Sequence, residues 1–251
     1  MGRPGPPAFE RRSVVVTGAT GNLGQAVVRA YLEAGAHVAI PVRDAAKVDA
    51  LRAGLGDLAG PGPHGTDGTD PKLLVVEAAL ADRVQMDAFV ERVMRTWGRL
   101  DVLASLAGGF GAGPADDVER IRALWEQNVA TVVVPAAACL VPMRARAYGR
   151  IVSVAAAAAL KGGRNTAGYS MAKGAVVRWT EALSAETKDQ GITVNAILPG
   201  TIDNPANRAS MPKADPKTWV QPAEAAALIL FLTSTEASGI TGAAIPIGGR
   251  A

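Results

Sequence analysis

Tyr169 and Lys173 are the residues whose types and spacing in this sequence best fit proton-transfer chemistry. They stand four residues apart in Tyr-Ser-Met-Ala-Lys, so a helix places both on one face. A free phenol titrates near 10, and a neighbouring ammonium favours the phenolate and lowers the pKa. Pairs with this spacing are also common on solvated helix surfaces. The pair therefore indicates acid–base chemistry only together with a second motif.

A glycine-rich turn upstream supplies that second motif. Thr17–Gly24 (TGATGNLG) follows the apolar run SVVVT and leads directly into a segment with helical spacing. Glycines let the backbone turn tightly and approach a pyrophosphate at the positive end of the helix dipole. An ordinary strand-to-helix turn is the alternative, but the position after a first strand favours dinucleotide binding. We expect contacts with the dinucleotide from Gly18, Thr20, Asn22, Leu23 and Gly24.

The end of the second predicted strand indicates which dinucleotide binds. A carboxylate there holds a ribose 2′-hydroxyl, whereas an arginine accommodates a 2′-phosphate. The strand ends at Val42 and is followed by Arg43, whose guanidinium can pair with phosphate. Asp44 is expected to cap the next helix instead. We therefore predict NADPH, with NAD less favoured; a surface arginine is the alternative.

The elements that must position these motifs alternate between apolar strands and helices, without an internal linker. This order predicts a single α/β domain, a doubly wound parallel sheet (Rossmann fold), over residues 13–251, preceded by a flexible tail at 1–12. Residues 54–72, rich in Gly, Pro and Asp, are expected to form a loop. We expect strands at 13–17, 37–42, 73–77, 100–106, 151–155, 192–197 and 243–247. We expect helices at 22–34, 44–53, 82–97, 116–147 (one long helix or two, bent at Pro135), 168–188 and 223–232.

Composition argues against several other classes of protein. The 26 basic and 23 acidic residues are interspersed, so we expect no nucleic-acid partner. The longest apolar run, Val129–Met143, has 15 residues. A bilayer span needs about 20, so no membrane association is expected. Cys139 is the only cysteine, which leaves no cysteine metal cluster, and no metal site is predicted. Without a signal segment, a cytoplasmic location is expected.

From about Ser13 to Gly249 the chain resembles the short-chain dehydrogenase/reductase family, through its glycine turn and the Tyr169–Lys173 pair. The resemblance implies that Tyr169 is the general acid/base and that Lys173 also holds the nicotinamide ribose. It implies that Asn128 holds a water in a proton relay, and that the protein forms a homodimer or homotetramer. Further implied contacts with the cofactor come from Ala107, Gly108, Pro199, Gly200, Ile202 and Asn204.

Three departures from the family pattern affect the expected activity. The serine that normally lies thirteen residues before the tyrosine is Ala156 here, and 155–159 are all alanine. Ser153 is expected to face the other side of the sheet. Losing a positioned donor to an oxyanion costs about 10²–10³-fold in rate, which disfavours ordinary ketone reduction. In addition, Asn22 replaces the usual middle glycine, and Ala79 replaces the aspartate expected near the adenine.

A second resemblance, to the quinonoid dihydropteridine reductases, suggests how the chain could work without the serine. Residues 107–110, 169–176 and 202–212 are similar to that branch, which also lacks the serine and reduces a conjugated ring. Our main hypothesis is therefore an NADPH-dependent reductase of a conjugated carbonyl or quinonoid small molecule. The alternatives are a cofactor-binding protein with little redox activity and a regulatory role, or a family member that now catalyses non-redox chemistry.

Overall fold

The computed structural model describes residues 9–43, 46–60 and 71–250. Seven parallel strands form one sheet in the order β3-β2-β1-β4-β5-β6-β7. The order reverses between β1 and β4, which defines the doubly wound Rossmann topology predicted from the sequence. The strands are β1 (Ser13–Thr17), β2 (His37–Val42), β3 (Leu73–Glu77), β4 (Val102–Ser105), β5 (Gly149–Val154), β6 (Ile192–Pro199) and β7 (Ala244–Ile247).

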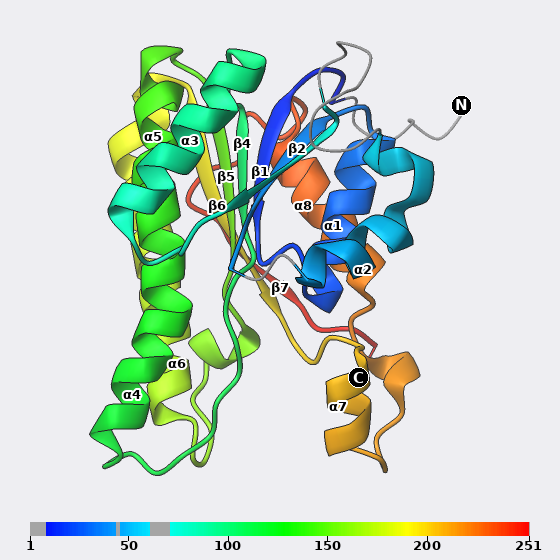
Figure 1. Cartoon of the computed structure of the whole chain (residues 1–251). Coiled ribbons are helices and arrows are strands. Elements are labelled where there is room, and N and C mark those ends of the chain that lie inside the picture. The colour runs from blue at the N-terminus through cyan, green and yellow to red at the C-terminus, as the bar shows by residue number, and fades with distance from the viewer. Residues whose placement is uncertain (1–8, 44–45, 61–70, 251) are drawn as a thin grey trace, which may run out of the picture.

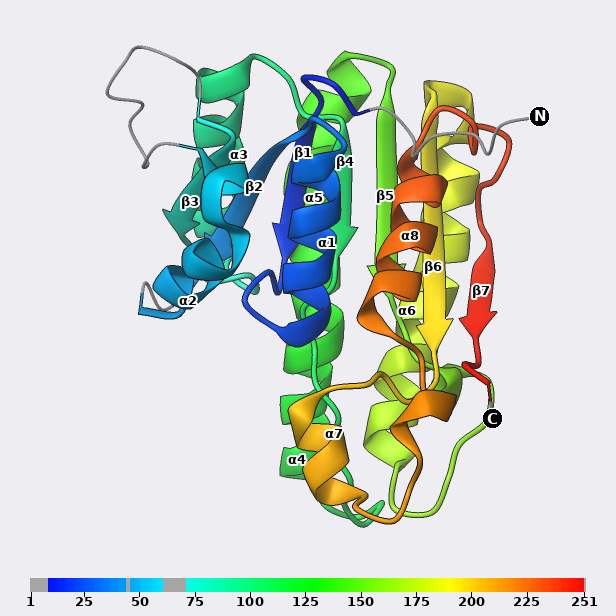
Figure 2. The ribbon, with the colours of Figure 1, turned by 90° about the vertical axis from the view of Figure 1, so that its right-hand side faces the viewer.

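Helices cover both faces of this sheet, as Figures 1 and 2 show. One face packs against α1, α2 and α8, and the other against α3, α5 and α6. Because both faces are covered, the strands are mostly apolar rather than alternating between apolar and polar residues. The helices are α1 (Asn22–Glu33), α2 (Ala46–Leu55), α3 (Arg83–Trp97), α4 (Val118–Trp125), α5 (Thr131–Ala145), α6 (Ala167–Thr187), α7 (Pro205–Ser210) and α8 (Pro222–Thr233).

The segment expected to form a flexible tail is ordered from Phe9 onward. The Phe9 side chain is fully buried, and its ring lies edge-on to Tyr31 with 5.1 Å between the centroids. Its backbone N–H donates to the carbonyl of Ala34 at 2.9 Å. Burying this aromatic ring offsets the entropy of ordering the segment. The domain therefore begins at or before Phe9, whereas residues 1–8 lie outside the described part of the chain.

Two further expectations about local structure were wrong. The expected loop at 54–72 is helical at its start, because α2 runs to Leu55 and a 3₁₀ turn follows at Gly56–Ala59. The segment 116–147, expected as one helix or two with a bend at Pro135, forms two helices, α4 and α5, which are joined at a π-helical turn, Glu126–Ala130, rather than bent at Pro135. The expected cap at Asp44 lies outside the described residues.

The joined helix Val118–Ala145 is the one helix in the described chain that is long and apolar enough to cross a membrane by length and composition. Half of its most apolar window is buried inside the domain. Val132, Ala136 and Met143 of α5 are fully buried. The apolar composition of this helix is therefore explained by its packing on the sheet.

Candidate active site

The glycine turn after β1 leaves room for an anion at the start of α1. Gly21 precedes the helix without a side-chain cap, so backbone N–H groups of its first turn are free for a ligand. A Cβ at Gly24 would lie 2.1 Å from the carbonyl oxygen of Gly18. Gly18 itself has φ +67°, and a Cβ there would lie 2.9 Å from the backbone nitrogen of Ala107. The turn thus requires glycine at both positions and fits a pyrophosphate.

A cavity of about 520 Å³ extends from this turn to the end of β2. Arg43 and Lys47 are its charged lining side chains, and both are exposed. Lys47 was missed in the sequence, although a second cation four residues after Arg43 was a usable signal. The predicted residues that the cavity brings together are Gly18, Thr20, Asn22, Leu23, Gly24, Arg43, Ala107 and Gly108.

Two of the predicted catalytic side chains, Asn128 and Lys173, converge on the backbone of Gly108, beyond the carboxyl end of β4. A Cβ at Gly108 would lie 2.7 Å from Asn128 Oδ1 and 3.1 Å from Lys173 Nζ. Lys173 and Tyr169 share one face of α6, with Nζ 6.0 Å from the phenol ring centroid. The Phe110 ring lies edge-on to Tyr169, with centroids 5.1 Å apart. The structure therefore brings Asn128, Tyr169 and Lys173 to the cofactor side of the β4–α4 loop.

Burial, rather than the lysine charge, controls the pKa values of this pair. Desolvation lowers the pKa of Lys173 to about 8. Desolvation also raises the pKa of Tyr169, whereas the sequence predicted that the ammonium would lower it. The reason is geometric: Lys173 Nζ donates to the carbonyl of Val154 at 2.9 Å instead of to the phenol. Tyr169 is therefore held as a protonated donor at neutral pH.

Asn128 is completely buried in the π-helical turn between α4 and α5. Its Oδ1 accepts from the N–H of Gly109 at 3.1 Å, and its Nδ2 donates to the carbonyls of Gly109 and Leu124 at 3.1 and 3.0 Å. These bonds fix the loop that carries Gly108 against the helix. The predicted role of Asn128 in holding a water stays a prediction.

The remaining predicted cofactor contacts lie at the end of β6 and the start of the segment Ile202–Val220, which we name the lid. Pro199 ends β6, and the Gly200 N–H donates to the carbonyl of Ile247 at 2.8 Å. Asn204 caps α7 by accepting from the Asn207 N–H at 2.8 Å. None of Pro199, Gly200, Ile202 and Asn204 lines the 520 Å³ cavity. Their contacts with a nicotinamide stay predictions.

No hydroxyl replaces the missing serine within residues 155–159, and Ala156 is buried at 8% exposure. Ser153 lies on the same face of β5 as Ile151 and Ala155, which pack against α5 and α6, so the alternation along the strand directs it away from the side expected for position 156. Its hydroxyl is nevertheless buried without a hydrogen-bond partner. Ser153 therefore does not supply the donor that Ala156 lacks.

The fold, the glycine turn and the Tyr–Lys pair together define a nicotinamide-dependent oxidoreductase. Residues 12–215 match the short chain dehydrogenase family, and the chain belongs to that family. It is an NAD(P)-dependent short-chain dehydrogenase/reductase.

Relatives of known structure or activity match nearly the whole chain. Meso-2,3-butanediol dehydrogenase of Serratia marcescens is 30% identical, over 97% of this chain and 95% of its own. The inactive 2-(S)-hydroxypropyl-CoM dehydrogenase 2 of Xanthobacter autotrophicus is 32% identical, over 89% and 98%. An NADPH-bound short chain oxidoreductase of Pseudomonas aeruginosa PAO1, which contains an atypical catalytic center, superposes with a TM-score of 0.86 at 26% identity over 97% and 98%.

Proposed function

We propose that this protein is a reductase that uses NADPH and acts on a conjugated carbonyl or quinonoid small molecule. The observation that carries the proposal is the placement of Lys173 beside Gly108 and within 6.0 Å of the Tyr169 ring centroid, while the serine position is Ala156. The proton donor and its neighbouring cation are present, but the second hydroxyl to the substrate oxygen is missing. Such a site suits substrates in which the negative charge delocalises.

The choice of NADPH rests on the two cations at the adenosine end of the cavity. Arg43 and Lys47 can both reach a 2′-phosphate placed there, and an arginine pairs with phosphate through two N–H groups. A carboxylate that would repel the phosphate is lacking among the described lining residues. The NADPH-bound relative with an atypical catalytic center is consistent with this choice.

The chain's own residues perform the proton part of the reaction. When bound, NADPH supplies the hydride to the electrophilic carbon of the substrate. The Tyr169 phenol donates its proton to the substrate oxygen, and the Lys173 ammonium stabilises the phenolate that remains. Asn128 holds the Gly109 backbone so that the loop beside the nicotinamide site stays in place.

Phe110 supports a planar substrate. Its side chain is 70% exposed, so most of the ring is open to contact with a substrate. It lies edge-on to the ring of Tyr169, with the centroids 5.1 Å apart. A flat conjugated ring can pack on Phe110 while its oxygen faces the phenol. The similarity to the quinonoid dihydropteridine reductases points to the same substrate class.

The test is turnover of NADPH with a panel of quinones, diketones and quinonoid dihydropterins. We expect oxidation of NADPH with conjugated substrates, weaker oxidation of NADH, and loss of turnover in Tyr169→Phe with retained NADPH binding. Turnover that Tyr169→Phe leaves unchanged would show that the phenol is not the proton donor.

A second candidate function is cofactor binding with little redox activity, in a regulatory role. It is favoured by Ala156 and by the 32% identical relative that is named inactive. Tight NADPH binding without turnover of any substrate in the panel would support it. Non-redox chemistry is a third candidate, which would give product without consuming NADPH.

We further propose that the protein forms a homodimer or homotetramer through α4 and α5. Trp125 is 42% exposed and Val141 is 62% exposed on these helices. A second copy would cover these apolar side chains. Light scattering of the purified protein tests this, with a monomer as the contrary result. A cytoplasmic location also stays a prediction.

A further inference from the structure

The lid is closed at its base. Ile202 pairs with Val220, and the backbone N–H of Asp203 donates to the carbonyl of Val220 at 2.9 Å. Trp219 is buried at 7% exposure next to this junction. The segment between these residues, which includes α7, is therefore joined to the domain at a single base where its two ends meet.

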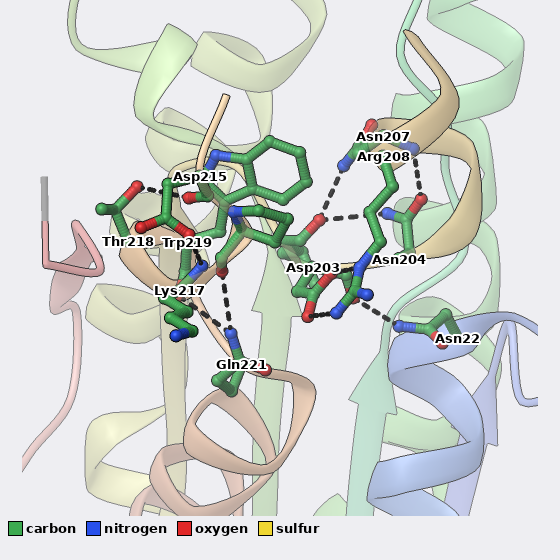
Figure 3. A network of polar contacts seen from close by, with 12 residues as sticks. Asn22, Asp203, Asn204, Asn207, Arg208, Asp215, Lys217, Thr218, Trp219 and Gln221 are labelled. Carbon is green, nitrogen blue, oxygen red and sulfur yellow. Dashed lines mark hydrogen bonds and ion pairs between the residues drawn. The ribbon is translucent and has the colours of Figure 1, made fainter. Parts of the chain in front are cut away.

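Inside the lid, polar contacts tie α7 to its base (Figure 3). Arg208 Nε and one terminal nitrogen contact both carboxylate oxygens of Asp203 at 2.6 and 2.7 Å. Asn204 and Asn207 both donate their side-chain amides to the carbonyl of Ile202, at 3.2 and 2.7 Å. These bonds make the first half of the lid one unit, so a contact to Asp203 acts on all of it.

Asn22 makes that contact from the glycine turn. Its Nδ2 donates to the carbonyl of Asp203 at 2.9 Å, across 181 positions of sequence. Figure 3 shows the Asn22 side chain directed from the start of α1 toward Asp203. A cavity of about 370 Å³ lies beside this bond, lined by Asn22, Asp203, Asn204, Pro205, Arg208 and Pro222. Glycine, the usual residue of the family at this position, has no side chain to make the bond.

We propose that Asn22 is a positioning residue that couples dinucleotide binding to closure of the lid. The residue has two connections: its backbone belongs to the first turn of α1, where the pyrophosphate is expected, and its side chain holds Asp203. Ordering of the turn by the dinucleotide therefore favours the closed lid, and a closed lid favours binding of the dinucleotide. By linkage, the two effects are equal in magnitude.

The test measures lid opening and NADPH binding in two variants that lack the amide donor. Asn22→Leu removes it without adding a charge, and Asn22→Asp replaces it with a carboxylate. Opening is followed by trypsin cleavage after the exposed Lys213 in protein without cofactor, with mass spectrometry of the fragments. A neutral hydrogen bond contributes about 0.5–1.5 kcal/mol, so cleavage should accelerate roughly 2- to 13-fold in both variants. The Kd for NADPH, from nicotinamide fluorescence, should rise in Asn22→Leu, because loss of the bond removes the coupling that favours the bound state.

Gln25→Ala is the matched control, because Gln25 donates from the same helix to the carbonyl of Thr20 and does not contact the lid. We expect its cleavage rate to equal that of the wild type. The inference rests on the cofactor-binding part of the proposed function, but the cleavage measurement needs neither cofactor nor turnover. Cleavage rates in both Asn22 variants that match the wild type would overturn the proposal. A faster cleavage with an unchanged Kd would overturn it as well, because the lid and the turn would then be uncoupled.

Discussion

Ala156→Ser restores a hydroxyl at the position where the family pattern has one and tests whether its absence selects the substrate. Ala156 follows β5 with an extended backbone, φ −166° and ψ 161°, which serine adopts without strain. The new hydroxyl enters a site that is 8% exposed. If it found no partner, the folded state would lose about 1–3 kcal/mol. The thermal unfolding of Ala156→Ser is therefore measured together with its kinetics.

The expected gain in activity depends on the substrate. A positioned donor to a developing oxyanion is worth about 2.7–4 kcal/mol, or 10²–10³-fold in kcat. An aliphatic diketone localises the charge on one oxygen, so we expect its kcat to rise by about that factor. A naphthoquinone delocalises the charge, and we expect its kcat to change by less than about threefold. The assay compares kcat and KM for both substrates with NADPH.

Ala157→Ser is the control, because it adds the same hydroxyl one residue further on, at an exposed position. This variant should leave the kcat and KM for both substrates unchanged. Equal increases for the diketone and the quinone in Ala156→Ser would refute the link between the missing donor and substrate choice. An unchanged diketone rate in a folded variant would show that residue 156 does not face the substrate oxygen.

Four further changes test other parts of the structure. Arg43→Ala with Lys47→Ala should raise the Kd for NADPH by about 10- to 100-fold and leave that for NADH unchanged, because only the 2′-phosphate loses its partners. Phe110→Ala should raise KM for a planar quinone about 2- to 13-fold, the equivalent of one aromatic contact, and leave an aliphatic diketone unchanged. Phe9→Ala should destabilise the fold by about 3–5 kcal/mol in denaturant unfolding, because the ring is fully buried. Burial lowers the pKa of Lys173 to about 8, so stability should rise with pH from about 8 to 10.5 by up to about 3 kcal/mol, and Lys173→Met should abolish this rise.

The expected rise in stability with pH follows from the protons that Lys173 binds in the folded and unfolded states. Between the folded and the unfolded pKa the unfolded chain binds more protons, so raising the pH favours the folded state. A flat difference between wild type and Lys173→Met over this window would contradict the lowered pKa. For Phe110, the exposed Phe231→Ala on α8 is the matched control. If Arg43→Ala with Lys47→Ala weakened the binding of NADH as strongly as that of NADPH, Arg43 and Lys47 would not contact the 2′-phosphate.

Much of the fold could be predicted because local patterns and tertiary environment agree. β1, β2 and β3 begin and end where predicted, since apolar β-branched runs there are bounded by glycine or polar residues. Phe9 was misassigned because a single aromatic residue among prolines and glycines has no periodic neighbours to indicate burial. The π-helical turn at Glu126–Ala130 was missed for a similar reason: the composition around it suits an uninterrupted α-helix.

The candidate site was predictable where chemistry follows from residue type and spacing. The glycine turn, Arg43 and Gly108 meet in one cavity as expected. The electrostatics of the Tyr–Lys pair were not predictable, because they depend on the carbonyl that Lys173 contacts. That partner, Val154, lies 19 residues upstream on β5, and its proximity follows only from the packing of α6 on the sheet.

These contacts restrict the chemistry that the site performs most easily. Lys173 Nζ and both polar atoms of Asn128 bond to backbone groups, and residue 156 carries no hydroxyl. In the proposed reaction, Tyr169 then both polarises and protonates the substrate oxygen. The barrier rises by about 2.7–4 kcal/mol for a carbonyl that concentrates charge on that oxygen. A conjugated acceptor avoids this penalty, because the charge created by hydride addition spreads over its own π system before the proton arrives. Under the proposed function, selection for a conjugated substrate thus follows from the missing donor at residue 156, to which packing on Phe110 adds.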